Sequence, residues 1–146
     1  MEIKPAGLKS PELLELFSEH DEYMMGFLGE HRKYYTPYSS AEHIGRAWIV
    51  YVDGRPAGCA AYRERGGGTG ELKRVFIRPG YRGRGISKEL VKTVEDYARG
   101  QGCHTLALDT NSVLEPAVTL YRHAGYRVVF REGEYIRMEK EIKVEL

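Results

Sequence analysis

The hydrophobic positions of the first 45 residues predict a strand, a long helix and an irregular segment. Residues 1–6 (MEIKPA) have the pattern of a short strand that ends at Pro5. Ser10 and Pro11 are suited to cap and begin a helix, and apolar side chains then recur at helical spacing through about residue 28. Residues 29–45 are polar and rich in tyrosine, which fits either another short helix or a surface loop.

Strand patterns return at residue 47. Residues 47–65 predict two strands joined at Asp53 and Gly54, a strong hairpin signal. The glycine-rich residues 66–70 (GGGTG) predict a flexible connection, and residues 71–78 (ELKRVFIR) predict the next strand. Side chains alternate along a strand, so the odd positions from Glu71 to Ile77 are expected to share one face.

Helical and strand patterns alternate through the rest of the chain. Residues 88–102 predict an amphipathic helix, residues 104–110 a strand, and residues 114–126 a short helix stopped by Gly125. The last two strands form a hairpin turned at Gly133. The order of elements predicts one mixed α/β domain that spans residues 1–146.

Composition narrows the classes of function. A formal net charge of +1 argues against a general nucleic-acid binder. No segment has the length and apolarity of a membrane span or a signal peptide, and Cys59 lies in an apolar run that favours a buried thiol over a disulfide. A cytoplasmic location is therefore expected. The five histidines show no metal-ligand spacing, so no metal is expected.

Residues 78–87 (RPGYRGRGIS) connect a predicted strand to a predicted helix. The first amides of a helix lack internal partners, and the helix dipole favours an anion there. Neither the Walker A pattern nor the dinucleotide-binding pattern fits, because Ile86 and Lys88 stand where those motifs need Lys and Gly. The alternatives are a different phosphate-binding turn or a plain turn with solvated arginines.

The same stretch resembles motif A of the GNAT (Gcn5-related N-acetyltransferase) superfamily, whose pattern is Q/R-x-x-G-x-G/A. Gly83 and Gly85 match the two small positions, and Arg82 matches the arginine that often precedes them. Gly80 departs from the pattern, and Ser87 stands where many members have a third small residue.

Residues 115–126 (EPAVTLYRHAGY) resemble the family's motif B, A-x-x-x-Y-x-x-x-G-F/Y. The motif is matched by Ala117, Tyr121, Gly125 and Tyr126. Leu114 replaces a frequent asparagine, and Asn111 or Ser112 is expected to supply the missing polar contact. The resemblance implies a mixed α+β GNAT-type fold. Such a fold has a central, twisted, mostly antiparallel sheet of six to seven strands flanked by about four helices.

The resemblance also implies acetyl-CoA as the cosubstrate. Its pyrophosphate would lie on the amides of Arg82, Gly83, Arg84, Gly85, Ile86 and Ser87, and its pantetheine arm would pair with the backbone of Val75, Phe76 and Ile77. Charge supports an anion at this place independently of the family, since five basic residues gather there in the sequence: Arg78, Arg82, Arg84, Lys88 and Lys92.

Acyl transfer from a thioester to an amine needs a proton donor for the thiolate and a proton acceptor for the amine. By the resemblance, Tyr121 is the expected acid. Glu71 is the expected base, acting directly or through a water chain, with Glu64 as the alternative. A purely structural ion pair is the competing interpretation of Glu71. The oxyanion donor is expected to be a backbone amide, such as that of Ile77.

The predicted function is N-acetylation of a primary amine on a small molecule or amino-acid-like acceptor, by direct attack in a ternary complex. A protein or peptide N-terminus is the alternative acceptor. The competing classes are a CoA-binding regulatory module without transfer activity and a nucleic-acid-binding domain, which the net charge disfavours. No nucleic acid or membrane partner is expected, a homodimer is possible, and Tyr34, Tyr35 and Tyr38 are candidates for the acceptor wall.

Overall fold

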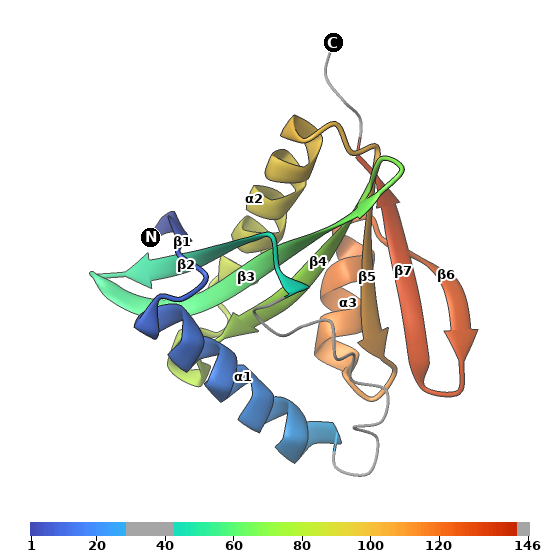
Figure 1. Ribbon diagram of the computed structural model, residues 1–146. Helices are drawn as coiled ribbons and strands as arrows, with labels where there is room; N and C mark the ends of the chain where they lie inside the picture. The colour runs from blue at the N-terminus through green and yellow to red at the C-terminus, as the bar shows by residue number, and fades with distance from the viewer. Residues whose placement is uncertain (29–42, 143–146) are drawn as a thin grey trace.

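The computed structural model describes residues 1–28 and 43–142, which form a seven-stranded sheet with helices on both faces (Figure 1). The strand order is β1-β2-β3-β4-β5-β7-β6. The strands are β1 (Glu2–Ala6), β2 (Arg46–Val52), β3 (Arg55–Gly66), β4 (Thr69–Ile77), β5 (Thr105–Asn111), β6 (Arg127–Glu132) and β7 (Tyr135–Glu141). The helices are α1 (Pro11–Leu28), α2 (Ile86–Gly100) and α3 (Glu115–His123), with a 3-10 turn η4 (Pro79–Tyr81).

All neighbouring strands are antiparallel except the pair β4 and β5. The predicted hairpin turn at Asp53 and Gly54 is confirmed, and both residues have the positive φ that such a turn requires, 51° and 76°. The prediction for residues 66–70 is wrong in part. Gly66 ends β3 and Thr69 begins β4, so that this segment is a tight hairpin rather than a free connection.

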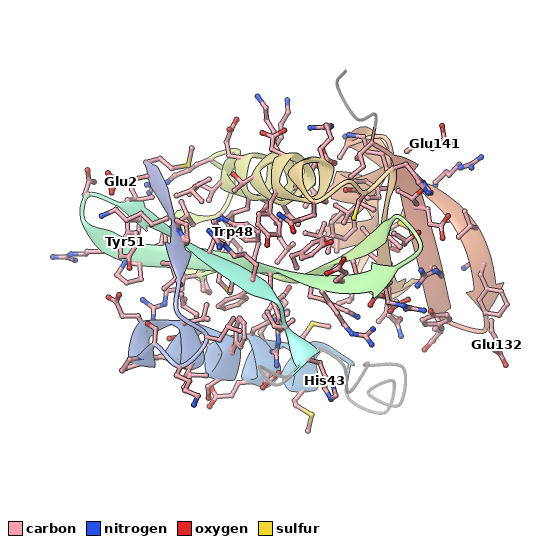
Figure 2. The ribbon with its side chains drawn as sticks, turned by 45° about the horizontal axis from the view of Figure 1, so that its top comes forward. Glu2, His43, Trp48, Tyr51, Glu132 and Glu141 are labelled. Atoms are coloured by element: carbon pink, nitrogen blue, oxygen red, sulfur yellow. The ribbon has the colours of Figure 1, made fainter. Side chains whose placement is uncertain are left out.

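The two faces of the sheet carry separate hydrophobic cores. Leu13, Leu16 and Phe17 of α1 pack with Phe76 on one face. Residues of α2, together with Tyr121 of α3, pack on the opposite face. Figure 2 shows the sheet seen from its edge between α1 and α2, with Trp48 directed toward α2, where it meets the ring of Tyr97 edge-on. The sheet is therefore buried on both sides, as the mixed pattern of its strands requires.

A β-bulge interrupts the middle of β4. Cys59 pairs with Phe76 and Ala61 with Lys73, so that Arg74 and Val75 together oppose one residue of β3. Arg74 has a φ of 57°, which is unusual for a residue with a side chain. The bulge shifts the alternation of side chains. The expectation that Glu71 shares a face with Ile77 is wrong, because Phe76 lies on the α1 face and Ile77 on the α2 face.

Strands β4 and β5 pair only over Thr69–Glu71 and Thr105–Ala107. Beyond Glu71 they diverge, and Figure 1 shows α3 lying at the place where they separate. Within the described ranges, the edge of β4 from Leu72 to Ile77 that faces β5 consequently has no strand partner. This split is the feature of the fold that positions the candidate site.

The remaining elements agree with the sequence patterns, except that Pro5 lies inside the edge strand β1 and does not end it. The helix that ends near residue 28, the amphipathic helix, the short helix and the final hairpin are confirmed. Both cysteines are free and buried, as predicted for Cys59. The possible short helix within residues 29–45 and the tyrosines 34, 35 and 38 lie largely or wholly outside the described residues. No helix in the described ranges is long and apolar enough to cross a membrane.

Close approach of β3 and β4 makes Gly58 a sensitive position. A Cβ atom there would overlap the backbone oxygen of Phe76 and lie 2.7 Å from the Cδ1 atom of Ile77. We expect Gly58→Ala to lower the free energy of unfolding by about 1–3 kcal/mol, measured by urea denaturation. Gly100→Ala, where the new methyl group meets no atom within 4 Å, is the matched control and is expected to be neutral. Equal effects of the two changes would contradict this account.

Candidate functional site: a cavity at the divergence of two strands

The split between β4 and β5 opens into a cavity of about 420 Å³. Its walls come from α1, the bulged half of β4, the turn before α2, the end of β5 and the start of α3. Among the residues named from the sequence, the lining includes Val75, Phe76, Ile77, Arg82, Ser87, Asn111 and Tyr121. The fold thus brings motif A, motif B and the central strand to one place. Gly83, Arg84, Gly85, Ile86 and Glu71 do not line it.

The turn before α2 presents a row of free amides. Gly83 and Gly85 have φ values of 80° and 75°, so that the chain turns sharply into the helix. Within the described part of the chain, the amides of residues 83–88 donate to no other group, since the first bond into the helix runs from the amide of Glu89 to the oxygen of Gly85. Free amides at a helix start suit an anion.

The basic residues in and around the turn differ in their contacts. The Arg82 guanidinium lies 4.6 Å from the ring centre of Tyr23 on α1, and its Nε donates to the oxygen of Ile77. Arg84, Lys88 and Lys92 are exposed near the start of α2. Arg78 differs from the expectation: it points to α1, where its Nε and Nη2 atoms lie 2.9 and 2.6 Å from the Glu19 carboxylate. The charge of Arg78 is therefore paired with Glu19 of α1 and is not directed toward the turn.

Tyr121 is buried in the cavity wall. Its ring packs edge-on against Tyr126, and its hydroxyl has no hydrogen-bond partner among the described residues. Burial raises the pKa of Tyr121 above its ordinary value, because the charged phenolate would be poorly solvated. The hydroxyl therefore keeps its proton at neutral pH.

Asn111 supplies a donor that the fold leaves unused. It is 2% exposed and lines the cavity. Its Oδ1 accepts from the amide of Val113 at 2.9 Å, while its Nδ2 has no partner within the described residues. An unpaired buried amide group costs free energy, which a ligand oxygen in the cavity would recover.

Glu71 is fully buried at the closed end of the split. Its carboxylate accepts from Arg63 at 2.7 Å, Arg65 at 2.9 Å and Arg137 at 3.4 Å. These three guanidinium groups pair with the carboxylate and offset the cost of burying its charge. Glu71 therefore does not line the cavity. It is connected to the cavity wall only through neighbouring side chains.

Asp109 and Lys73 lie between Glu71 and the cavity and line its wall. Lys73 Nζ is 3.4 Å from Asp109 Oδ2 and 4.0 Å from Glu71 Oε1. The Tyr135 hydroxyl donates to Asp109 Oδ1 at 2.5 Å, and burial with this bond raises the pKa of Tyr135 to about 12. Sequence reasoning missed this pair. A charged residue inside each of two apolar strand patterns was the available signal.

The α1 wall of the cavity also went unrecognised in the sequence. His20, Tyr23 and Met24 line it, and His20 stacks on Phe76 at 5.3 Å. The bulge residue Arg74 ties this wall to β4, because its Nη1 lies 2.6 Å from Asp21 Oδ1 and 3.3 Å from the oxygen of Phe17. Helical spacing assigned Tyr23 and Met24 only to an apolar stripe, and His20 was considered only as one of the histidines without metal-ligand spacing. The described residues contain no cluster of three or more metal-ligating side chains.

The chain matches the Acetyltransferase (GNAT) family over residues 12–126. It therefore belongs to this family, as the resemblance of its two motifs predicted. An "IAA acetyltransferase" of Azospirillum brasilense is 38% identical over 82 residues, which are 56% of this chain and 54% of that protein. The chain spans about half the length of the first curated relatives that it matches.

Solved structures agree with the fold. The PaiA N-acetyltransferase of Thermoplasma acidophilum, in complex with coenzyme A, has a TM-score of 0.75 at 18% identity, over 96% of this chain and 98% of that one. A GNAT family acetyltransferase of Elizabethkingia anophelis, with acetyl-CoA bound, has a TM-score of 0.70 at 17% identity, over 96% and 97% of the two chains. The GNAT-type fold predicted from the sequence is confirmed.

The buried His20 makes stability depend on pH. Burial, and then the charge of Arg74, lower its pKa from 6.5 to about 4. Below pH 6.5 the unfolded chain takes up a proton that the folded chain refuses, so that stability falls as the pH drops from 6.5 toward 4. Between pH 7.5 and pH 5 we expect the wild type to lose about 2 kcal/mol more than His20→Gln in urea denaturation. Parallel losses would contradict this assignment.

Removing the charge of Glu71 tests its structural role. We expect Glu71→Gln to lower the free energy of unfolding by about 3 kcal/mol, because three arginines lose their shared counter-charge. Glu64→Gln removes an exposed carboxylate from β3 and is expected to change stability by less than about 0.5 kcal/mol. Chemical denaturation at pH 7.5 measures both, and a Glu71→Gln protein as stable as wild type would overturn the role.

Proposed function

We propose that this protein is an acetyl-CoA-dependent N-acetyltransferase that modifies a primary amine of a small acceptor by direct attack in a ternary complex. The observation that carries the proposal is the convergence, in one cavity, of the unpaired β4 edge and the buried Tyr121, beside the free amides of the turn. The family to which the chain belongs supports the same reaction class.

The described residues fit the cosubstrate at three independent places. The amides of Arg82, Gly83, Arg84, Gly85, Ile86 and Ser87 are proposed to receive the pyrophosphate. The backbone of Val75, Phe76 and Ile77 is proposed to pair with the pantetheine arm, since this edge has no strand partner. The unused Nδ2 of Asn111 is proposed to donate to one of its carbonyl oxygens. Bound acetyl-CoA supplies an acyl thioester.

Tyr121 is proposed as the acid for the departing thiolate. A phenol that holds its proton through neutral pH, and that has no hydrogen-bond partner among the described residues, is free to donate to a group in the cavity. As the N–C bond forms, the C–S bond breaks. The nitrogen of the acceptor gives up two protons in all: one ends on the thiol by way of Tyr121, and the other reaches solvent.

The proton of the acceptor ammonium is proposed to leave through water toward Asp109 and Glu71. Asp109 borders the cavity, whereas Glu71 lies behind it and carries three arginine partners. Glu71 therefore acts at a distance, as the water-relayed form of the sequence prediction requires. The oxyanion donor is proposed to be a backbone amide of the bulged half of β4, where that of Ile77 is the candidate.

Three further assignments remain proposals. The free, buried Cys59 and Cys103 fit a reducing compartment, which favours the cytoplasm. A homodimer has a suitable surface in the edge strand β6, where Val129 and Phe130 are about half exposed. A peptide N-terminus remains the alternative acceptor.

Titration calorimetry with acetyl-CoA, followed by thiol release against a panel of amines, tests the proposal. Binding in the micromolar range together with acceptor-dependent release of thiol is the expected result. Binding with no release from any acceptor would favour a CoA-binding module without transfer activity. Failure of the protein to bind acetyl-CoA would overturn the proposed function.

Tyr121→Phe separates chemistry from binding. We expect kcat to fall about 100-fold, because the thiolate loses its proton donor, while the Kd for acetyl-CoA stays within about twofold. Tyr97→Phe, the same change at a tyrosine that packs between α2 and the sheet outside the cavity, is expected to leave kcat unaltered. A retained kcat, or a Kd that rises in step with the loss of kcat, would refute the role of Tyr121 as an acid.

A further inference from the structure

Lys73 is a buried cation that the protein only partly satisfies. Its side chain is 4% exposed and borders the cavity from β4. An ammonium group has three N–H donors. The hydrogen bonds of Lys73 Nζ amount to one long bond of 3.4 Å, to Asp109 Oδ2, within the part of the chain that the structure describes. Two of the three N–H donors are therefore left without a partner among the described residues, on a side chain that borders the cavity.

The neighbouring carboxylates are already occupied. Asp109 also accepts from the Tyr135 hydroxyl at 2.5 Å and from Arg137 Nη1 at 3.4 Å. Glu71 lies 4.0 Å from Lys73 Nζ, beyond hydrogen-bond distance, and serves Arg63, Arg65 and Arg137. Three carboxylates, those of Glu71, Asp109 and Glu139, contact four cationic groups here, so that the closed end of the split carries one more positive charge than negative charges.

A purely structural Lys73–Asp109 pair accounts for these contacts less well. A buried ion pair offsets its desolvation only with short bonds and satisfied donors, and Lys73 has neither. A methionine or leucine would fill the same position on β4 without this cost. The geometry is better explained if the ammonium group of Lys73 binds an oxygen atom of a ligand.

We propose that the acceptor carries a carboxylate close to its primary amine, and that Lys73 binds this carboxylate. The substrate class is thus a small amino acid rather than a simple amine or a peptide N-terminus. This inference rests on the proposed function and adds to it the recognition of the acceptor.

The spacing along β4 supports a short acceptor. Lys73 directly precedes the bulge. The proposed carboxylate position is therefore two to four residues from Val75 to Ile77, where the pantetheine arm is proposed to lie. At about 3.3 Å per residue this separation is roughly 7–13 Å. A small amino acid can bridge this distance when the reach of the Lys73 side chain and of the β4 backbone groups is included. A peptide N-terminus would offer Lys73 a neutral amide carbonyl in place of the carboxylate.

Matched acceptors test the proposal directly. Thiol release is followed with the full-length protein and acetyl-CoA against the twenty amino acids, the amide of each, and dipeptides that begin with each. The amide and the dipeptide keep the α-amine and side chain but replace the α-carboxylate by a neutral group. We expect at least one amino acid to exceed its own amide and dipeptides by tenfold or more in kcat/KM.

Variants of Lys73 connect the preference to this residue. Lys73→Met is expected to reduce the ratio of kcat/KM for the amino acid over its amide from at least tenfold toward one, mainly through KM. Lys73→Arg, which keeps the charge, is expected to retain most of the ratio. Lys9→Met makes the same change at an exposed lysine outside the site and serves as the control. If Lys73→Met does not fold, the ratio in Lys73→Arg and Lys73→Gln replaces it.

Three outcomes overturn the proposal. The first is that amides or dipeptides equal the amino acids as acceptors. The second is that Lys73→Met leaves the ratio unchanged. The third is that none of the amino acids is acetylated although acetyl-CoA binds normally. Failure of acetyl-CoA itself to bind is a different result, since it overturns the proposed function rather than the choice of acceptor. The calorimetric titration on the same sample distinguishes the two.

Discussion

The site depends on the early end of the pairing between β4 and β5. Three residue pairs hold the two strands together, and beyond Glu71 the backbone of β4 has an unpaired edge in the middle of the sheet. Unpaired backbone groups inside a protein need partners. An edge at the centre of a sheet, next to a cavity, is therefore a place where an extended ligand gains hydrogen bonds without disturbing the fold. The strand on the other side, β3, pairs along the whole of β4 and keeps it rigid.

The bulge at Arg74 and Val75 links this edge to the opposite wall. The extra residue turns the Arg74 side chain into α1, where it contacts Asp21 and the backbone of Phe17. A left-handed φ at an arginine is a local strain that these buried contacts offset. The bulge thus fixes the position of α1 relative to the strand on which the cosubstrate is proposed to lie. A substitution that displaces α1 is therefore expected to displace β4 as well, and the reverse.

Charge organises the closed end of the split. A buried glutamate among three arginines, beside a lysine and an aspartate, holds β3, β4, β5 and β7 together where the strands begin to diverge. Burying such a network has a desolvation cost in free energy. This cost is offset only when each charged group has a hydrogen-bonded partner of opposite charge. Here the match is incomplete at Lys73, on the side that borders the cavity. The structural network and the proposed acceptor site are therefore adjacent.

The sequence by itself determined the elements, the family and the glycine-rich turn before α2, because these depend on local patterns. Glycines at 83 and 85, the Asp53-Gly54 turn and the periodicity of the helices act within a few residues of chain, and each is where the patterns placed it. Tyr121 and Asn111 were also found locally, through motif B and its departure at Leu114. Their joint position on one cavity wall agrees with that motif.

Tertiary structure alone decided the face on which each β4 side chain lies and the partners of its charges. Strict alternation predicted that Glu71 and Ile77 share one face, but the bulge at Arg74 and Val75 places them on opposite faces. The bulge is an extra residue relative to the partner strand β3. The sequence of residues 71–78 alone therefore gives no sign of it. The arginines around Glu71 come from positions 63, 65 and 137, which are brought together by strand order. A carboxylate can be recognised in a sequence, but the ion pairs that it makes depend on neighbours that only the folded chain supplies.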